Sequence, residues 1–79
     1  MNENKKKVIV DARGVFCPIP LMELIKAIKQ ANVGDIVIVY SSDSGSKIDI
    51  PNWVERNGHK LVSVNEKEGY IEFIVEKQK

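Results

Sequence analysis

The chain has 79 residues, of which 43% are hydrophobic and 29% are charged, and its formal net charge is +1. This length and composition are typical of one small globular domain rather than a disordered or fibrous chain. The near-neutral charge and the lack of an apolar run of roughly 18 residues argue against direct nucleic-acid binding and a membrane span. We therefore expect a cytoplasmic protein with a flexible N-terminal tail at 1–7 and a single domain at 8–79.

The first half of the chain predicts a strand and an amphipathic helix. A short apolar run at 8–10 is typical of a strand, and a glycine-containing loop then leads to Cys17. From Pro18 onward, hydrophobic residues recur at helical spacing, which predicts a helix ending near Asn32. Because proline is tolerated in the first turn of a helix, Cys17 is expected at or beside the N-cap.

The start of the second helix can be placed in two ways. Ser46 followed by Asp49 resembles a capping box, but this start would put Pro51 inside the helix. With Asp49 as the N-cap, Pro51 falls in the first turn, where it costs little. We prefer the second placement, and Gly58 is expected to end the helix.

Three further strands complete the predicted fold. The apolar, β-branched run at 36–40 predicts a central strand, and the runs at 61–64 and 70–75 predict an antiparallel hairpin. The element order is then βαβαββ. Right-handed crossovers would place both helices on one face of a four-stranded mixed sheet, which gives an α/β (α+β) two-layer sandwich.

Cys17 is the residue most suited to chemistry. Because the chain has a single cysteine, an internal disulfide and a C-x-x-C pair are excluded. A metal site is not expected either, because His59 is the only histidine that could join Cys17 as a ligand. A helix N-terminus favours the reactive thiolate, although Pro18 and Pro20 lack N–H groups and leave only Ile19 as a donor in the first three helical positions. The alternative is a small buried hydrophobe, and the position between a glycine-containing loop and a helix start favours the surface thiol.

Two basic residues are candidates for contact with partners. Arg13 could attract a persulfide or an acidic partner, whereas an exposed arginine is more often a solvated charge. Lys26 lies on the outer face of the first helix, more than two turns from Cys17, and could help to dock a partner. We expect Trp53 to belong to the core and His59 to end the second helix.

The chain resembles the TusA/SirA family of small sulfur-carrier proteins from Val8 to Val75. The most specific element is the C-P-x-P motif at the first helix, and the loop after the second strand departs from the family's usual Asp-Pro because it contains Asp43-Ser44. The residues that carry the resemblance are Asp11, Arg13-Gly14, Cys17-Pro18-Ile19-Pro20, Lys26, Gly34-Asp35, Asp49-Ile50-Pro51, Trp53 and Gly58-His59.

The resemblance implies a fold like the C-terminal domain of translation initiation factor three and a cysteine that carries sulfur as a persulfide. Cys17 would be the carrier thiol, Gly14, Pro18 and Pro20 would shape its turn, and Arg13 and Lys26 would dock partners. The donor would be a cysteine desulfurase or a rhodanese-type protein. The acceptor would be a protein of tRNA thiolation, cofactor synthesis or sulfur metabolism.

The leading hypothesis is therefore a carrier protein rather than a turnover enzyme, acting as a monomer and without a cofactor. A second cysteine would discharge the persulfide prematurely, so its absence suits this role. The alternative is a regulatory or protein-interaction module in which Cys17 is structural or senses redox state.

Overall fold

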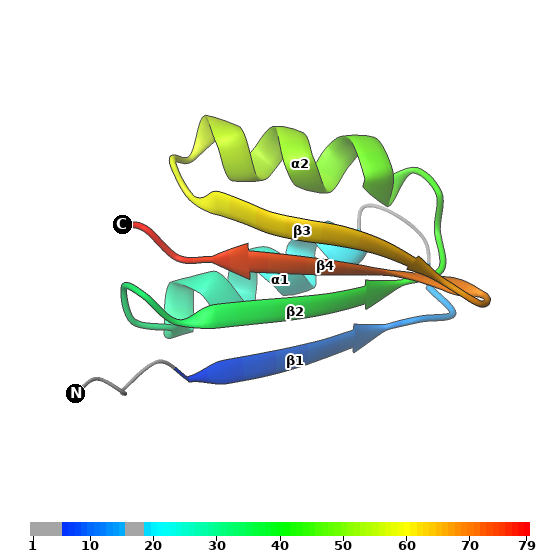
Figure 1. Cartoon of the computed structure of the whole chain (residues 1–79), viewed down its shortest axis with the longest axis horizontal. Helices are drawn as coiled ribbons and strands as arrows, with labels where there is room; N and C mark the ends of the chain where they lie inside the picture. The colour runs from blue at the N-terminus through cyan, green and yellow to red at the C-terminus, as the bar shows by residue number, and fades with distance from the viewer. Residues whose placement is uncertain (1–5, 16–18) are drawn as a thin grey trace.

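The computed structural model describes residues 6–15 and 19–79. Four strands and two helices follow one another in the predicted order (Figure 1). Their bounds are β1 at Lys7–Ala12, α1 at Ile19–Gln30, β2 at Ile36–Ser41, α2 at Ser46–Arg56, β3 at Lys60–Lys67 and β4 at Tyr70–Glu76.

The strands form one mixed sheet in the order β1-β2-β4-β3. β1 pairs with β2 in parallel, whereas β2 and β3 both pair antiparallel to β4. The predicted mixed sheet, the central position of β2 and the terminal hairpin are confirmed. Because β1 and β2 are parallel, the loops that follow both strands leave from the same end of the sheet.

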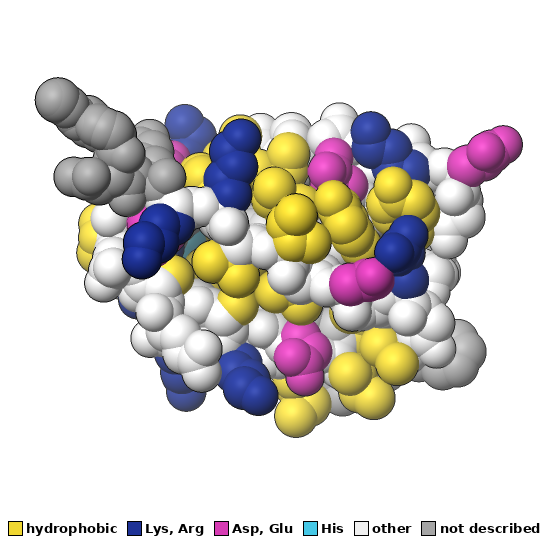
Figure 2. All heavy atoms as spheres, turned by 90° about the horizontal axis from the view of Figure 1, so that it is seen from below, with side chains coloured by type: hydrophobic (Ala, Val, Ile, Leu, Met, Phe, Trp, Pro, Cys, Tyr) yellow, Lys and Arg dark blue, Asp and Glu magenta, His cyan; other side chains and the backbone are white. Residues whose placement is uncertain are grey.

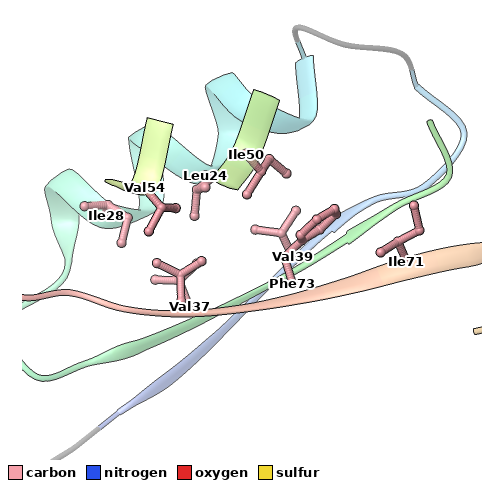
Figure 3. Close-up of a cluster of buried hydrophobic side chains, with 9 residues drawn as sticks. Leu24, Ile28, Val37, Val39, Ile50, Val54, Ile71 and Phe73 are labelled. Carbon is pink, nitrogen blue, oxygen red and sulfur yellow. The ribbon is translucent and has the colours of Figure 1, made fainter. Parts of the chain in front are cut away.

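The core lies between the two helices and one face of the sheet. Residues alternate between buried and half-buried along β2 and β4, so every second side chain points toward the helices. The helices contribute apolar side chains at helical spacing, which meet those of the sheet (Figure 3). The buried cluster comprises Leu24, Ile28, Val37, Val39, Ile50, Val54, Ile71, Phe73 and Val75.

β3 is longer than its apolar pattern predicts. The strand continues to Lys67, and the turn is confined to the residues before Tyr70, where Gly69 has a φ of +86°. Asn65 supports the extension because its side-chain amide donates to Glu72 Oε1 of β4 at 3.1 Å. A register shift between Leu61 and Ser63 interrupts the pairing of β3 with β4.

The preferred start of the second helix is wrong. α2 begins at Ser46 rather than after Asp49, and Pro51 lies inside it. The Ser46 N–H donates to the Asp43 carbonyl, and the buried Ser46 hydroxyl is hydrogen-bonded to that of Ser41 at 2.8 Å. These contacts stabilise the first turn of α2, which begins directly after Gly45. They offset the loss of the helical hydrogen bond that Pro51 cannot donate.

The end of α2 agrees with the sequence. Gly58 has a φ of +77°, its N–H donates to the Glu55 carbonyl, and the His59 N–H donates to the Val54 carbonyl. This pair of hydrogen bonds is a Schellman motif, which needs a residue in the left-handed conformation and therefore favours glycine.

Candidate functional site

The candidate site lies where the parallel strands β1 and β2 end and both helices begin. The Gly14 N–H donates to Ser42 Oγ at 2.8 Å, which joins the loop after β1 to the loop after β2. α1 starts at Ile19 and α2 at Ser46 on this same side, so the positive ends of both helix dipoles lie at this end of the sheet.

The structure describes four of the six predicted site residues. Cys17 and Pro18 lie outside the described residues, between Val15 and Ile19 in the chain. Pro20 is fully buried as the second residue of α1, where its missing N–H is tolerated. Arg13 and Gly14 belong to the loop that precedes Cys17.

Lys26 is set apart from this loop. It is exposed and lies seven residues beyond Ile19, which is about 10 Å along the axis of α1. Lys26 therefore sits on the flank of the molecule and not at the end where the two loops meet.

Arg13 is held in place by Asp11 and by two tyrosines. Its Nε and Nη2 donate to the two carboxylate oxygens of Asp11 at 2.8 and 2.7 Å. The guanidinium carbon lies 5.5 Å from the ring centre of Tyr40 and 5.1 Å from that of Tyr70, and the two rings meet edge to face. Such cation–π contacts each favour this position of the cation. Arg13 is therefore a fixed part of the surface and not a freely moving charge.

The same contacts set the charges of this cluster. The hydrogen bonds from the Arg13 side chain and backbone lower the pKa of Asp11 from 3.8 to about 2, and Asp11 in turn raises the pKa of Arg13. At neutral pH the positive charge of Arg13 is therefore largely balanced by the carboxylate of Asp11.

We expect the Asp11 carboxyl to titrate near pH 2 in the folded protein. Its contribution to stability is present above its unfolded pKa of 3.8 and is lost as the pH falls through about 2, because its folded pKa is depressed. A carboxyl-carbon NMR titration measures this midpoint. In Arg13→Ala the midpoint should return toward 3.8, and a midpoint of 3.8 in the unmodified protein would contradict the assigned pairing.

The loop after β2 is organised by hydroxyl groups and Asp43. The Asp43 N–H donates to Ser41 Oγ at 3.2 Å, and the Gly45 N–H donates to Asp43 Oδ1 at 3.1 Å. Ser41 and Ser46 are both fully buried. The loop is therefore a polar connection that fixes the first turn of α2 beside the loop that leads to Cys17.

Gly14 is required by its backbone conformation. Its φ is +88°, and a Cβ added there would meet no atom within 4 Å, so a substitution would strain the backbone without a clash. We expect Gly14→Ala to lower the free energy of unfolding by about 1–2 kcal/mol in a urea titration. Gly45→Ala is the matched control, because Gly45 has a φ of −61° and its added Cβ would make only ordinary contacts. Equal losses in the two variants would contradict this interpretation.

Exposed apolar side chains flank the start of each helix, and they were not identified from the sequence. Ile19 and Met22 are 45% and 59% exposed on α1, and Ile48 is 66% exposed on α2. Met22 and Ile48 both fall outside the apolar stripe of their helix, which is the signal that could have marked them. Exposed apolar residues that gather near one end are typical of surfaces that contact other proteins.

His59 lies away from this end. It follows α2, its ring stacks on Trp53 at 5.5 Å, and its Nδ1 accepts the Gln78 N–H at 3.1 Å. Burial is the main cause that lowers the pKa of His59, and the positive charges of Lys77 and Lys79 lower it further. The side chain therefore helps to close the far end of α2, and Trp53 packs against the core as expected. Over residues 6–15 and 19–79, no cluster of three His, Cys, Asp or Glu side chains could hold a metal ion.

A model of the family described as "Sulfurtransferase TusA" matches residues 8–77 of this chain. The chain is 54% identical over 72 residues to an Archaeoglobus fulgidus protein named "Putative sulfur carrier protein", covering 91% of this chain and 99% of the relative. It is 32% identical over 69 residues to the sulfur carrier protein TusA of Pseudomonas syringae, covering 87% and 82%.

The fold is similar to that of a solved structure. A SirA-like protein from Desulfitobacterium hafniense superposes with a TM-score of 0.79 at 25% sequence identity, over 91% of this chain and 99% of the other. In the part of the chain that the structure describes, no helix has the length and apolar character needed to cross a bilayer.

Proposed function

Because the chain belongs to the TusA family, whose curated members are named as sulfur carriers, we propose that Cys17 carries sulfane sulfur as a persulfide. The match of the family model over residues 8–77 carries this proposal, because it spans the motif that contains Cys17 and both helices. The protein would act as a carrier between two other proteins in the cytoplasm, where thiols are kept reduced.

Loading is a transfer of one sulfur atom between two thiols. The Cys17 thiolate attacks the terminal sulfur of a donor persulfide, an S–S bond forms at Cys17, and the donor's S–S bond breaks. The donor leaves as a thiolate, so there is no net oxidation. Discharge is the same step in the opposite sense, since an acceptor nucleophile attacks the terminal sulfur and Cys17 leaves as a thiolate.

The end of the sheet from which the loop toward Cys17 leaves would suit this exchange. The dipoles of α1 and α2 present positive ends at this end of the sheet and favour thiolate and persulfide anions there. The turn would be shaped by Gly14, whose positive φ sets the course of the loop, together with Pro18 and the buried Pro20.

We further propose that partners dock on the surface around this end. The exposed Ile19, Met22 and Ile48 would supply apolar contacts, and Arg13 would supply a rigid polar anchor of a residue type common at the centres of interfaces. Lys26 would add a contact at the rim. One copy contains every residue that the relay uses, so the exchange itself needs no second copy.

A single-turnover chase tests the relay. The chain is loaded by a cysteine desulfurase with cysteine, or by a rhodanese with thiosulfate, and is then freed of the donor. A low-molecular-weight thiol should take up the sulfane sulfur as the protein returns to its unloaded mass. A loaded chain that retains its sulfur in the presence of the thiol would contradict a carrier role. A chain that never loads, although Cys17 is readily alkylated in the folded protein, would favour the regulatory alternative.

A further inference from the structure

β1 forms an outer edge of the sheet, and its pairing with β2 is regular. β1 and β2 pair in register without interruption from Lys7 to Ala12, and no described residue pairs with the other side of β1. β3, the opposite edge strand, carries the register shift near Val62, a device that disfavours pairing with another chain. The two edges therefore differ, and β1 is the one suited to a further strand.

The direction of the backbone groups along β1 follows from its pairing with β2. The Ile36 N–H donates to the Lys6 carbonyl, so even-numbered residues of β1 turn their backbone groups toward β2. The backbone groups of Lys7, Ile9 and Asp11 then point away from the sheet. The side chains of these three residues lie on the face opposite the helices, because Ile9 is in register with the half-buried Ile38.

We propose that β1 pairs antiparallel with β1 of a second copy of this chain, centred on Ile9, to form one continuous eight-stranded sheet. In this register Ile9 faces its own equivalent, and Lys7 of each copy faces Asp11 of the other. Lys7, Ile9 and Asp11, whose side chains would pair across the dimer, are also the residues whose backbone groups point outward. Backbone pairing and side-chain pairing therefore favour the same register.

Charge complementarity identifies a second copy as the occupant. A lone charge on an edge strand opposes pairing, but the segment Lys7-Val8-Ile9-Val10-Asp11 carries one charge of each sign, placed symmetrically about its central residue. Asp11 can accept from Lys7 of a partner while it holds Arg13, because an ionised carboxylate has about four acceptor positions.

The pairing would also cover exposed apolar surface. Ile9 is 60% exposed, and Ile9, Ile38 and Ile74 lie side by side across β1, β2 and β4. Figure 2, which views the molecule from the side of β1, shows hydrophobic side chains gathered at the centre with charged side chains around them. Two copies would join these rows of isoleucine into one. The proposal departs from the monomer expected from the sequence and does not depend on the sulfur relay.

The test is sedimentation velocity of the full chain, with a reductant present to prevent a disulfide through Cys17, from about 10 µM to about 1 mM. We expect a monomer–dimer equilibrium. Lys7→Glu and Asp11→Lys should each weaken the dimer about ten-fold or more. In either variant residues 7 and 11 carry the same charge, so two like-charged pairs face each other across the dimer. An equal mixture of the two variants should recover most of the association as a heterodimer, since residues 7 and 11 of each copy then face opposite charges across the paired strands.

Two further measurements complete the test. Lys60→Glu, at the start of the other edge strand β3, should leave the dimer unchanged. In the unmodified chain, amide exchange of Lys7, Ile9 and Asp11 should slow as the concentration rises, which needs no variant to fold. A monomer at every concentration would overturn the proposal, as would a dimer that resists both charge changes or a mixture that fails to recover association.

Discussion

Replacing Cys17 by serine should reduce sulfur transfer from donor to acceptor to the background rate. A serine hydroxyl stays protonated at neutral pH and cannot form a persulfide, and the chain has no other cysteine to take over the role. With radiolabelled cysteine and a desulfurase, the unmodified chain should acquire label that a reductant removes, and Cys17→Ser should acquire none.

The fold should survive this change, because serine replaces one side-chain atom of cysteine by a smaller one and therefore adds no bulk. Circular dichroism and the thermal midpoint of Cys17→Ser should therefore match those of the unmodified chain. A variant that unfolds would indicate a structural cysteine, and a folded variant that still takes up label would show that the sulfur resides elsewhere. The control Ser42→Ala removes the hydroxyl that accepts from the Gly14 N–H, and this variant should retain labelling at Cys17.

Phe73→Ala should have the largest effect on stability. Phe73 is fully buried on β4, at the centre of the cluster between the sheet and both helices (Figure 3). Truncation of a buried phenylalanine removes apolar burial and leaves a cavity, at a cost of about 3–5 kcal/mol. A domain of this length has a total stability of only about 4–12 kcal/mol, so this loss would remove about a quarter of it or more.

Ile74→Ala is the matched control for this prediction. Ile74 is the next residue of the same strand and points to the opposite face, where it is only half-buried. A urea titration should therefore give a clearly smaller loss for Ile74→Ala than for Phe73→Ala. Similar losses in the two variants would mean that the sheet buries its two faces equally, contrary to the structure.

The elements could be predicted where one local pattern decides them. The change from short apolar runs to helical spacing predicted the first helix, and the apolar run at 70–75 predicted the last strand. The order of elements, combined with the handedness of crossovers, then constrained the layer arrangement. These inferences depend only on residues that are near one another in the chain.

The start of α2 shows why other features could not be predicted. The local preference of Pro51 for a first turn favoured a start after Asp49, but the contact between the hydroxyls of Ser41 and Ser46 depends on the end of β2 meeting the helix. This contact between a strand and a helix stabilises the helix start, and the helix propensity of the segment alone cannot predict that effect.

The surroundings of Arg13 illustrate the same limit at the site. The sequence marked Arg13 as an exposed cation, whereas the sheet brings Tyr40 and Tyr70 to it from strands β2 and β4. The positions that matter for this cluster lie 27 and 57 residues away in the chain, so only the strand order could bring them together. Cys17 could be proposed as the carrier thiol because a motif and a unique residue type coincide in one short segment.

The intact mass of the purified chain after incubation with a cysteine desulfurase and cysteine shows directly whether Cys17 takes up sulfur. We expect a gain of one sulfur atom, assigned by peptide mapping to Cys17 and lost on treatment with a reductant. An unchanged mass with both desulfurase and rhodanese donors, while the Cys17 thiol remains free and reactive, would contradict the assignment of this chain as a persulfide carrier.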